Sequence, residues 1–362
     1  MGWVHASRAG ARGRDFWAWV WIAASLPLVL VGLPELSSGF DYWPALALVR
    51  HIQYGSSFIF AYPLPIYLPF APLGLLPDPW PQLLAPVICL AFLAWGLWLW
   101  GAHRMPVMAA VLLSPVGLGV LANSNFNTAV AIFGFGLAVW AKRRGHSPLV
   151  GLGMALSLWR PANCLPALAV LLASGWRWRD LGLAVATGTV FMAPLIAIAF
   201  VVQPGWIGTY RDVLQMDLHW AGLGPHLLLV GGPIAYAGAQ LAVALAGIWL
   251  LRRRTLAEAV AFTLALTVLL GTVAGAYSGS PALPALVLAA DEARYATLPA
   301  VAGAIGWIQA VTLLRIGFPV GVVAYWFVLQ AYPLVRRPRD SRPRLEVATK
   351  PAEEVAHSSP GA

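Results

Sequence analysis

Long apolar runs, separated by short polar or basic segments, dominate this chain of 362 residues. A helix needs roughly 20 mostly apolar residues to cross a bilayer, and backbone groups in lipid must find their hydrogen bonds within the segment. We therefore expect helices, and the pattern predicts an all-α, polytopic transmembrane helical bundle with about 10–12 spans. The apolar runs cover 16–34, 81–101, 105–121, 125–141, 148–160, 162–175, 181–202, 226–250, 256–275, 296–314 and 316–335.

The composition supports a membrane protein, because 60% of the residues are hydrophobic and only 10% are charged, against about a quarter in soluble domains. The formal net charge is +9, but the basic residues cluster at the ends of apolar runs, where they indicate topology rather than a nucleic-acid partner. The two cysteines, Cys89 and Cys164, both lie in apolar runs and are interpreted as packing residues.

Basic clusters mark the cytoplasmic side of a membrane protein. With the N-terminus in the cytoplasm, the internal clusters all fall on that side. The segments 35–80, 122–124, 203–225 and 276–295 then fall outside. Two runs, 148–160 and 162–175, are short for crossings, so they predict a broken or re-entrant hairpin around Arg160-Pro161.

An odd number of spans would put the Arg-rich C-terminal tail outside, which the charge rule disfavours. We therefore expect one further crossing near 281–290, or a piece within 296–335 that does not span. The predicted organisation is an integral membrane domain over 1–335, which includes a cytoplasmic N-terminal segment over 1–15, and a disordered cytoplasmic tail over 336–362.

Two of the outer segments have aromatic and apolar residues at helical spacing. These segments, 41–54 and 204–220, predict short helices that lie in the membrane interface. The first belongs to the long extracytoplasmic loop 35–80, which carries the strongest candidate for chemistry.

That candidate is Asp41, seven residues beyond the end of the first apolar run. A carboxylate near the hydrocarbon boundary is costly to desolvate, which raises its proton affinity and suits it to act as a general base. The alternative is a helix N-cap, because Asp is a favoured residue there. Both roles stay open.

Arg160 is the second candidate, in an otherwise apolar stretch. A cation within a membrane segment usually faces the protein interior or a wet cavity, and the planar guanidinium suits a phosphate. The alternatives are a snorkelling side chain or a pair with a buried acid. The phosphate role is favoured.

Three amides, Asn123, Asn125 and Asn127, lie between two apolar runs on the predicted outer side. They could bind sugar hydroxyls. A hydrogen-bonded helix start or an interhelical contact explains the same spacing equally well. Aromatic and basic side chains on the predicted outer loops are weaker candidates for binding the substrate, and these are Tyr42, His51, Tyr62 and His219.

Several kinds of site have no motif in this sequence. There is no Walker loop, no dinucleotide-binding glycine pattern, no HExxH and no Cys/His cluster. We therefore expect neither a metal nor another cofactor, and a nucleotide-sugar transferase that needs Mg²⁺ or Mn²⁺ is disfavoured.

Taken in order, several motifs over about residues 15–200 resemble a known family. They are Asp41, Tyr54-Gly55, Tyr62-Pro63-Leu64-Pro65, the run Asn123 to Asn127, Arg160-Pro161 and Trp176-Arg177-Trp178-Arg179. This order resembles the GT-C polyprenyl-phosphate-dependent glycosyltransferases of the GT87 group, which include α-1,2-mannosyltransferases. Here the Asn run replaces the family's usual Gly-Gln-x-Asn, and Arg160 stands where Lys is common.

The resemblance implies a GT-C-like fold and a metal-independent, inverting glycosyltransferase of the plasma (inner) membrane. It would move a sugar, with mannose the first choice, from a polyprenyl-phosphate donor to an acceptor hydroxyl on a lipid or glycan at the extracytoplasmic face. Asp41 would take the acceptor proton, and Arg160 would bind the donor phosphate. The partners would be that donor, that acceptor and membrane lipids. The alternatives are a membrane transporter or lipid-carrier flippase, and a scaffold without activity.

Overall fold

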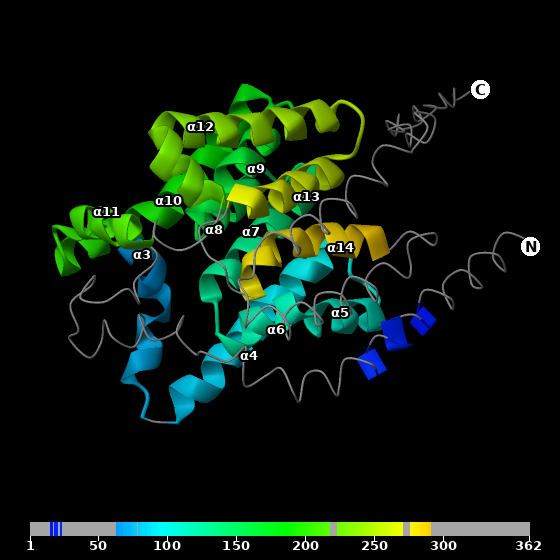
Figure 1. Ribbon diagram of the computed structural model, residues 1–362, viewed down its shortest axis with the longest axis horizontal. Coiled ribbons are helices and arrows are strands. Elements are labelled where there is room, and N and C mark those ends of the chain that lie inside the picture. The colour runs from blue at the N-terminus through cyan, green and yellow to red at the C-terminus, as the bar shows by residue number, and fades with distance from the viewer. Residues whose placement is uncertain are drawn as a thin grey trace, which may run out of the picture.

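A computed structural model of the chain describes residues 15–16, 18–20, 22–23, 63–77, 79–217, 223–270 and 276–290. Within these ranges every regular element is a helix, and there is no strand (Figure 1). The elements are α3 (Leu64–Tyr67), η1 (Leu68–Leu75), α4 (Trp80–Trp100), α5 (Met105–Leu112), α6 (Pro115–Ala122), α7 (Phe126–Arg143), α8 (Ser147–Ser157), α9 (Pro161–Ala173), α10 (Trp178–Val202), α11 (Trp206–Asp217), α12 (Leu223–Leu251), α13 (Leu256–Thr267), η2 (Val268–Leu270), η3 (Ala276–Ala282) and α14 (Leu283–Ala290).

The all-α prediction is confirmed for the described residues. Three helices, Trp80–Trp100, Trp178–Val202 and Val230–Leu251, are long and apolar enough to cross a membrane. The number rises to four if α5 and α6, which meet at a 70° bend, form one span. These helices are compatible with a membrane protein, while the total of 10–12 spans stays a prediction.

Several predicted spans form shorter helices. The expected break around Arg160-Pro161 is present, because α8 ends at Ser157 and α9 begins at Pro161. The described part of the run 256–275, which ends at residue 270, forms the 12-residue helix α13 and a 3-10 turn. Near 281–290, where a further crossing was predicted, the described part of α14 has eight residues.

Helix α7 forms the centre of the bundle. Of its 18 residues, 15 are buried, and it packs against α4 on one side and α8 on the other. The indole nitrogen of Trp100, at the end of α4, donates a hydrogen bond to the carbonyl of Ile132 on α7 at 3.2 Å. An indole N–H that is buried needs such a partner, so this bond fixes how α4 lies on α7.

The contact between α7 and α8 depends on glycine. A Cβ atom at Gly153 of α8 would lie 2.6 Å from the backbone nitrogen of Ala138 and 2.6 Å from the carbonyl oxygen of Gly134. Real Cβ atoms do not approach other atoms so closely, so the two backbones can meet only because neither glycine has a side chain. Small residues at helix crossings are typical of membrane helix packing, because they let the backbones approach.

The outermost helices present apolar side chains to their surroundings. Only 6% of the apolar window of α10 is buried, and 17% of that of α12, which runs along one edge of the bundle in Figure 1. In water such continuous apolar surfaces would favour aggregation. In a bilayer they would contact lipid.

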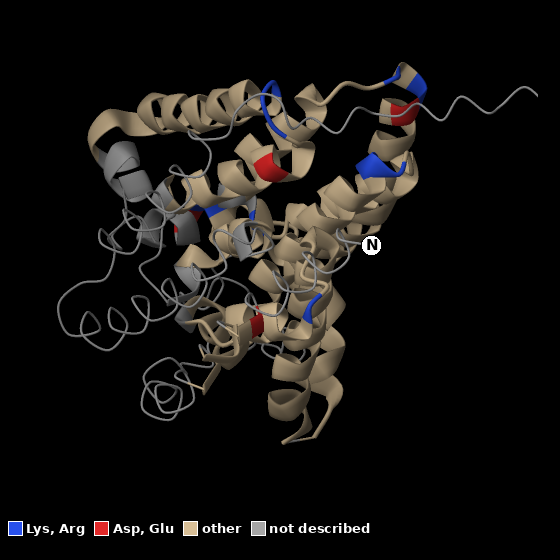
Figure 2. Cartoon of the chain, turned by 90° about the vertical axis from the view of Figure 1, so that its right-hand side faces the viewer, with Lys and Arg blue, Asp and Glu red and all other residues tan. Residues whose placement is uncertain are grey.

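Three of the basic segments lie near the last turn of α7. At its last turn, Lys142 donates to the carbonyl of Gly175, which follows α9, at 2.6 Å. A Cβ at Gly247 would lie 2.6 Å from Val170, so the ends of α9 and α12, and with them Arg252, also lie close together. Figure 2 shows Lys and Arg residues at helix ends and connections.

Two further contacts bear on the predicted topology. Asp15, beside the first predicted span, forms an ion pair of 2.9 Å with Arg104 in the connection between α4 and α5. Both segments were predicted to be cytoplasmic, and this contact brings them together. The assignment of either end to the cytoplasm stays a prediction.

The short helix predicted over 204–220 is present as α11. The interfacial helix predicted over 41–54, and the tail over 336–362, lie outside the described residues.

Candidate functional site

Arg160 occupies the break between α8 and α9 and serves as the N-cap residue of α9. Its partly buried guanidinium donates two hydrogen bonds from the same nitrogen, Nη1. One goes to the hydroxyl of Thr128 at 2.6 Å, and the other goes to the hydroxyl of Ser280 at 2.8 Å. Three segments that are far apart in sequence therefore meet at this cation.

The two partners of Arg160 are neutral, and no carboxylate among the described residues forms an ion pair with it. A guanidinium has five N–H donors, and the two bonds from Nη1 leave those on Nε and Nη2. The hydroxyls orient the fork without neutralising its charge. Such an arrangement is suited to a ligand anion, because Arg binds phosphate through two parallel hydrogen bonds.

The asparagine run forms the sharp turn between α6 and α7. The side chain of Asn125 caps α7 by accepting a hydrogen bond from the backbone N–H of Thr128 at 2.9 Å. The amide of Asn123 donates to the carbonyl of Gly119 at 2.7 Å. Ser124 between them has a φ of 49°, which is uncommon for a residue other than glycine. The predicted helix start is therefore confirmed for Asn125.

Asn127 occupies the first turn of α7 and is 2% exposed. Asn123 and Asn125 are also buried. In the described structure the three amides are therefore not accessible to a sugar. The geometry instead gives this run a positioning role. It holds Thr128, and Thr128 accepts a hydrogen bond from Arg160.

The end of the first long loop packs beside Arg160. The indole of Trp159, which is 1% exposed, donates to the carbonyl of Ile66 in α3 at 3.2 Å. Phe70 of η1 stacks on Phe126 at the start of α7, with ring centroids 4.1 Å apart. Segment 64–75 is thus attached to the residue before Arg160 and to the start of α7, as expected if the outer loops share one end of the molecule.

A second cluster at this end joins the same loop to the start of α11. Leu64 and Tyr67 pack with Ala199 and Trp206. The indole nitrogen of Trp206 is buried and has no hydrogen-bond partner among the described residues. Segments from the first loop, from α10 and from α11 therefore border the region around Arg160.

Of the predicted site residues, the structure brings together Arg160 and the turn that contains Asn123, Asn125 and Asn127. The others lie outside the described residues, and these are Asp41, Tyr42, His51, Tyr62 and His219. Sequence reasoning missed Ser280 altogether. Its only signal is a small hydroxyl residue between Gly279 and Pro281 in a predicted outer loop, which does not point to a partner 120 residues away.

Among the described residues there is no group of three or more His, Cys, Asp or Glu that could hold a metal ion. Cys89 and Cys164 are buried and form no disulfide within the described residues. The thiol of Cys89 donates a weak hydrogen bond to the carbonyl of Val120 at 3.6 Å. It therefore contributes to the contact between α4 and α6.

The chain was compared with models of protein families, with curated proteins and with solved structures, and none of them matches it.

Proposed function

We propose that the protein is a metal-independent, inverting membrane glycosyltransferase of the GT-C type. It moves a sugar, with mannose the first choice, from a polyprenyl-phosphate donor to an acceptor hydroxyl on a lipid or glycan. The observation that carries this proposal is the guanidinium of Arg160, held by two neutral hydroxyls. The resemblance of the motif order to the GT87 group supplies the reaction class.

In the proposed reaction the acceptor oxygen attacks the anomeric carbon of the donor sugar. The bond from that carbon to the phosphate oxygen breaks, and the polyprenyl phosphate leaves with the electron pair. Arg160 stabilises the negative charge that grows on this phosphate, because donors fixed in advance act most strongly on charge that develops in the transition state. Asp41 takes the proton from the acceptor hydroxyl.

The region around Arg160 suits a lipid donor. Arg160 is partly buried at a helix break, and large apolar surfaces of α10 and α12 would lie in the bilayer. A carrier with an isoprenoid tail can reach a cation at the membrane edge while its tail stays in lipid. A water-soluble nucleotide sugar would not require a site at the membrane edge, and the sequence has no nucleotide-binding motif.

A panel of donors tests the proposal. Membranes containing the protein receive radiolabelled mannose, glucose or arabinose on polyprenyl phosphate, and the label in lipid and glycan products is measured. We expect transfer from one of these donors, and a loss of about 10²–10³-fold in rate for Arg160→Ala, the range for removing one oxyanion donor. Arg179→Ala, which removes an exposed arginine elsewhere, is the matched control.

Arg160→Lys gives a sharper result. It keeps the charge but loses the planar fork, so we expect partial activity with weaker donor binding. If none of the three donors is used by the wild type, or if Arg160→Ala transfers sugar as fast as the wild type, the proposal fails.

A transporter or lipid-carrier flippase is the second candidate, and a break in α12 favours it. Gly232 has a φ of 69° and precedes Pro233, which interrupts the helix. Broken helices of this kind form substrate sites in transporters. Proteoliposomes without an ion gradient separate the two functions, because a transferase makes labelled product there, whereas a flippase only moves the intact donor between leaflets.

A further inference from the structure

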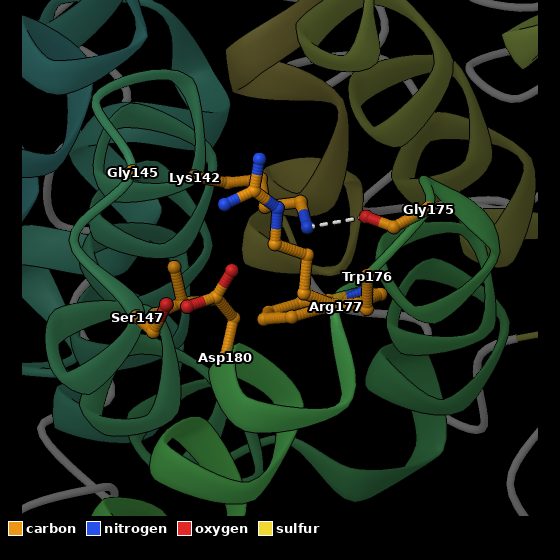
Figure 3. Close-up of a pocket in the computed structure, with 8 residues that line it drawn as sticks. Lys142, Gly145, Ser147, Gly175, Trp176, Arg177 and Asp180 are labelled. Atoms are coloured by element: carbon orange, nitrogen blue, oxygen red, sulfur yellow. Dashed lines mark hydrogen bonds between the residues drawn. The ribbon is translucent and has the colours of Figure 1, made fainter.

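A cavity of about 360 Å³ opens at the end of α7 opposite Thr128 and Arg160. It lies where α7 and α9 end and where α8 and α10 begin. Figure 3 shows the side chains of Lys142, Arg177 and Asp180 directed into the same space. The volume is within the range of small-molecule sites, roughly 300–1,000 Å³.

Lys142 is held in place at one wall of this cavity. Its ammonium donates to the carbonyl of Gly175 at 2.6 Å and lies 3.4 Å from the centroid of the Trp176 ring. An ammonium has three N–H donors, so the bond to Gly175 leaves two for a ligand. A lysine that is already ordered by these contacts loses less side-chain entropy when it binds.

Arg177 supplies the second cation. Its side chain is exposed, and Figure 3 shows the guanidinium extending over the cavity towards Lys142. Within the part of the chain that the structure describes, no hydrogen bond or ion pair engages this guanidinium. All of its donors are therefore available to a ligand.

Two helix starts add to the positive potential. Both α8 and α10 begin at the cavity, and neither N-cap residue, His146 or Arg177, makes a side-chain capping bond. The first N–H groups of a helix lack intrahelical partners, and the helix dipole places partial positive charge there. Ser147, 7% exposed, lines the cavity at the start of α8.

The charges around the cavity favour an anion. Asp180 is the one acid among the residues that line it, and it faces the two cations Lys142 and Arg177. Exposed arginines follow next to the cavity at Arg143, Arg144 and Arg179. The surroundings are therefore positive despite Asp180.

The aromatic residues indicate the depth of the cavity in a membrane. Trp178, at the first position of α10, is 89% exposed, and Trp176 lines the cavity. Tryptophan is enriched at the level of lipid headgroups. The cavity therefore lies at the level where phosphates of lipids are found, next to the outward apolar face of α10.

We propose that this cavity binds a phosphate group, and that in the membrane this phosphate belongs to the headgroup of an anionic phospholipid. Basic pockets between helices on the cytoplasmic side bind such headgroups in the same way. The two remaining donors of Lys142, the fork of Arg177 and the open N–H groups of α8 and α10 face the phosphate oxygens. The inference does not depend on the proposed transferase activity.

The test uses the full chain in a neutral detergent, with thermal unfolding followed by tryptophan fluorescence. Phosphatidylglycerol, phosphatidylcholine and phosphatidylethanolamine are titrated separately as mixed micelles, and inorganic phosphate is titrated alone. We expect phosphatidylglycerol to raise the unfolding temperature at concentrations at least fivefold lower than phosphatidylcholine. If inorganic phosphate stabilises the protein but phosphatidylglycerol is not preferred over the other lipids, the proposal that the phosphate belongs to a phospholipid is wrong.

Two variants locate the effect. We expect Arg177→Gln to raise the half-saturating concentration of phosphatidylglycerol at least fivefold. The matched control is Arg253→Gln, because Arg253 is likewise an exposed arginine but lies over Trp249, outside the cavity. It should change the half-saturating concentration less than twofold. Equal losses of phosphatidylglycerol affinity in the two variants would show that the lipid responds to overall surface charge and not to this cavity, and the proposal would be wrong.

Asp180→Asn distinguishes an anion from a zwitterion. Removing the acid takes away a charge of the same sign as the phosphate, so we expect this variant to bind phosphatidylglycerol several-fold more tightly. A preference for phosphatidylethanolamine that Asp180→Asn abolishes would show that the acid holds a ligand ammonium, and the proposal would be wrong.

Discussion

The guanidinium of Arg160 donates a hydrogen bond of 2.8 Å to the hydroxyl of Ser280, a residue 120 positions further along the chain. The same nitrogen bonds Thr128, 32 positions earlier. These two bonds join the break between α8 and α9 to the start of α7 and to η3, and they fix the direction of the candidate phosphate-binding cation.

The first prediction concerns these two hydroxyls. Thr128→Val and Ser280→Ala each remove one partner of Arg160 while keeping most of the side-chain volume. Hydrogen bonds to charged groups contribute about 1.5–3 kcal/mol, so we expect each variant to weaken donor binding by about tenfold or more. Apparent donor affinity in the transfer assay measures this effect.

The double variant, Thr128→Val with Ser280→Ala, tests whether the two hydroxyls act on Arg160 together. Because both hydroxyls act on one guanidinium, their effects should be non-additive. Strictly additive losses, or losses in thermal stability without any change in donor affinity, would contradict the positioning role.

The second prediction concerns Asp41 as the general base. Asp41→Asn keeps the shape of the side chain but cannot accept the acceptor proton, so we expect transfer to fall by roughly 10²–10⁴-fold. Expression and thermal unfolding should stay unchanged. Asn is also a good N-cap residue, so normal transfer in this variant would leave Asp41 with the capping role alone.

The third prediction concerns the packing of α7 on α8. At Gly153 a Cβ atom would meet backbone atoms of Ala138 and Gly134 at 2.6 Å. Overpacking typically costs about 1–3 kcal/mol, so Gly153→Ala should lower the thermal unfolding temperature clearly. Gly208→Ala is the matched control, because a Cβ there meets nothing within 4 Å. Equal stability of the two variants would exclude the close approach.

The fourth prediction concerns pH. Burial in the cavity lowers the pKa of Lys142 from the ordinary lysine range by removing water from the ammonium, and Asp180 opposes this shift. The charged groups that face Lys142 are Arg177 and Asp180, both from the start of α10. We expect affinity for phosphatidylglycerol to fall as the pH rises through this lowered pKa, because the neutral amine no longer attracts a phosphate.

Lys142→Arg serves as its control. Arginine stays charged over the whole accessible range, so this variant should keep its affinity where the wild type loses it. The half-saturating lipid concentration, measured from neutral to alkaline pH, decides between the two outcomes. A parallel fall in both proteins would assign the loss to another group.

The comparison of sequence and structure shows where local signals suffice. The helix over 81–101 and the break at Arg160-Pro161 follow from apolar run lengths and from a proline, and both are present. The capping role of Asn125 follows from its place before an apolar run. Each of these features depends on residues within one or two helical turns.

Features that depend on contacts between residues far apart in the chain could not be predicted from the sequence. Nothing local to Ser280 indicates that it meets Arg160, because that contact arises only when η3 packs against α6 and α7. The 70° bend between α5 and α6 was missed, although Ser114 before Pro115 is a common helix start. The run 105–121 was interpreted as one continuous apolar segment, and the Ser114-Pro115 pair was not used as a helix boundary.

Helix α7 connects the two ends of the molecule. Thr128 lies in its first turn and Lys142 in its last, and at 1.5 Å per residue the two positions are about 21 Å apart. Because α7 is enclosed by its neighbours for nearly its whole length, one continuous buried helix links the two sites. A tilt or slide of the whole helix would shift the hydroxyl beside Arg160 and the ammonium beside Gly175 together, so the candidate phosphate site and the cavity are built on one shared element.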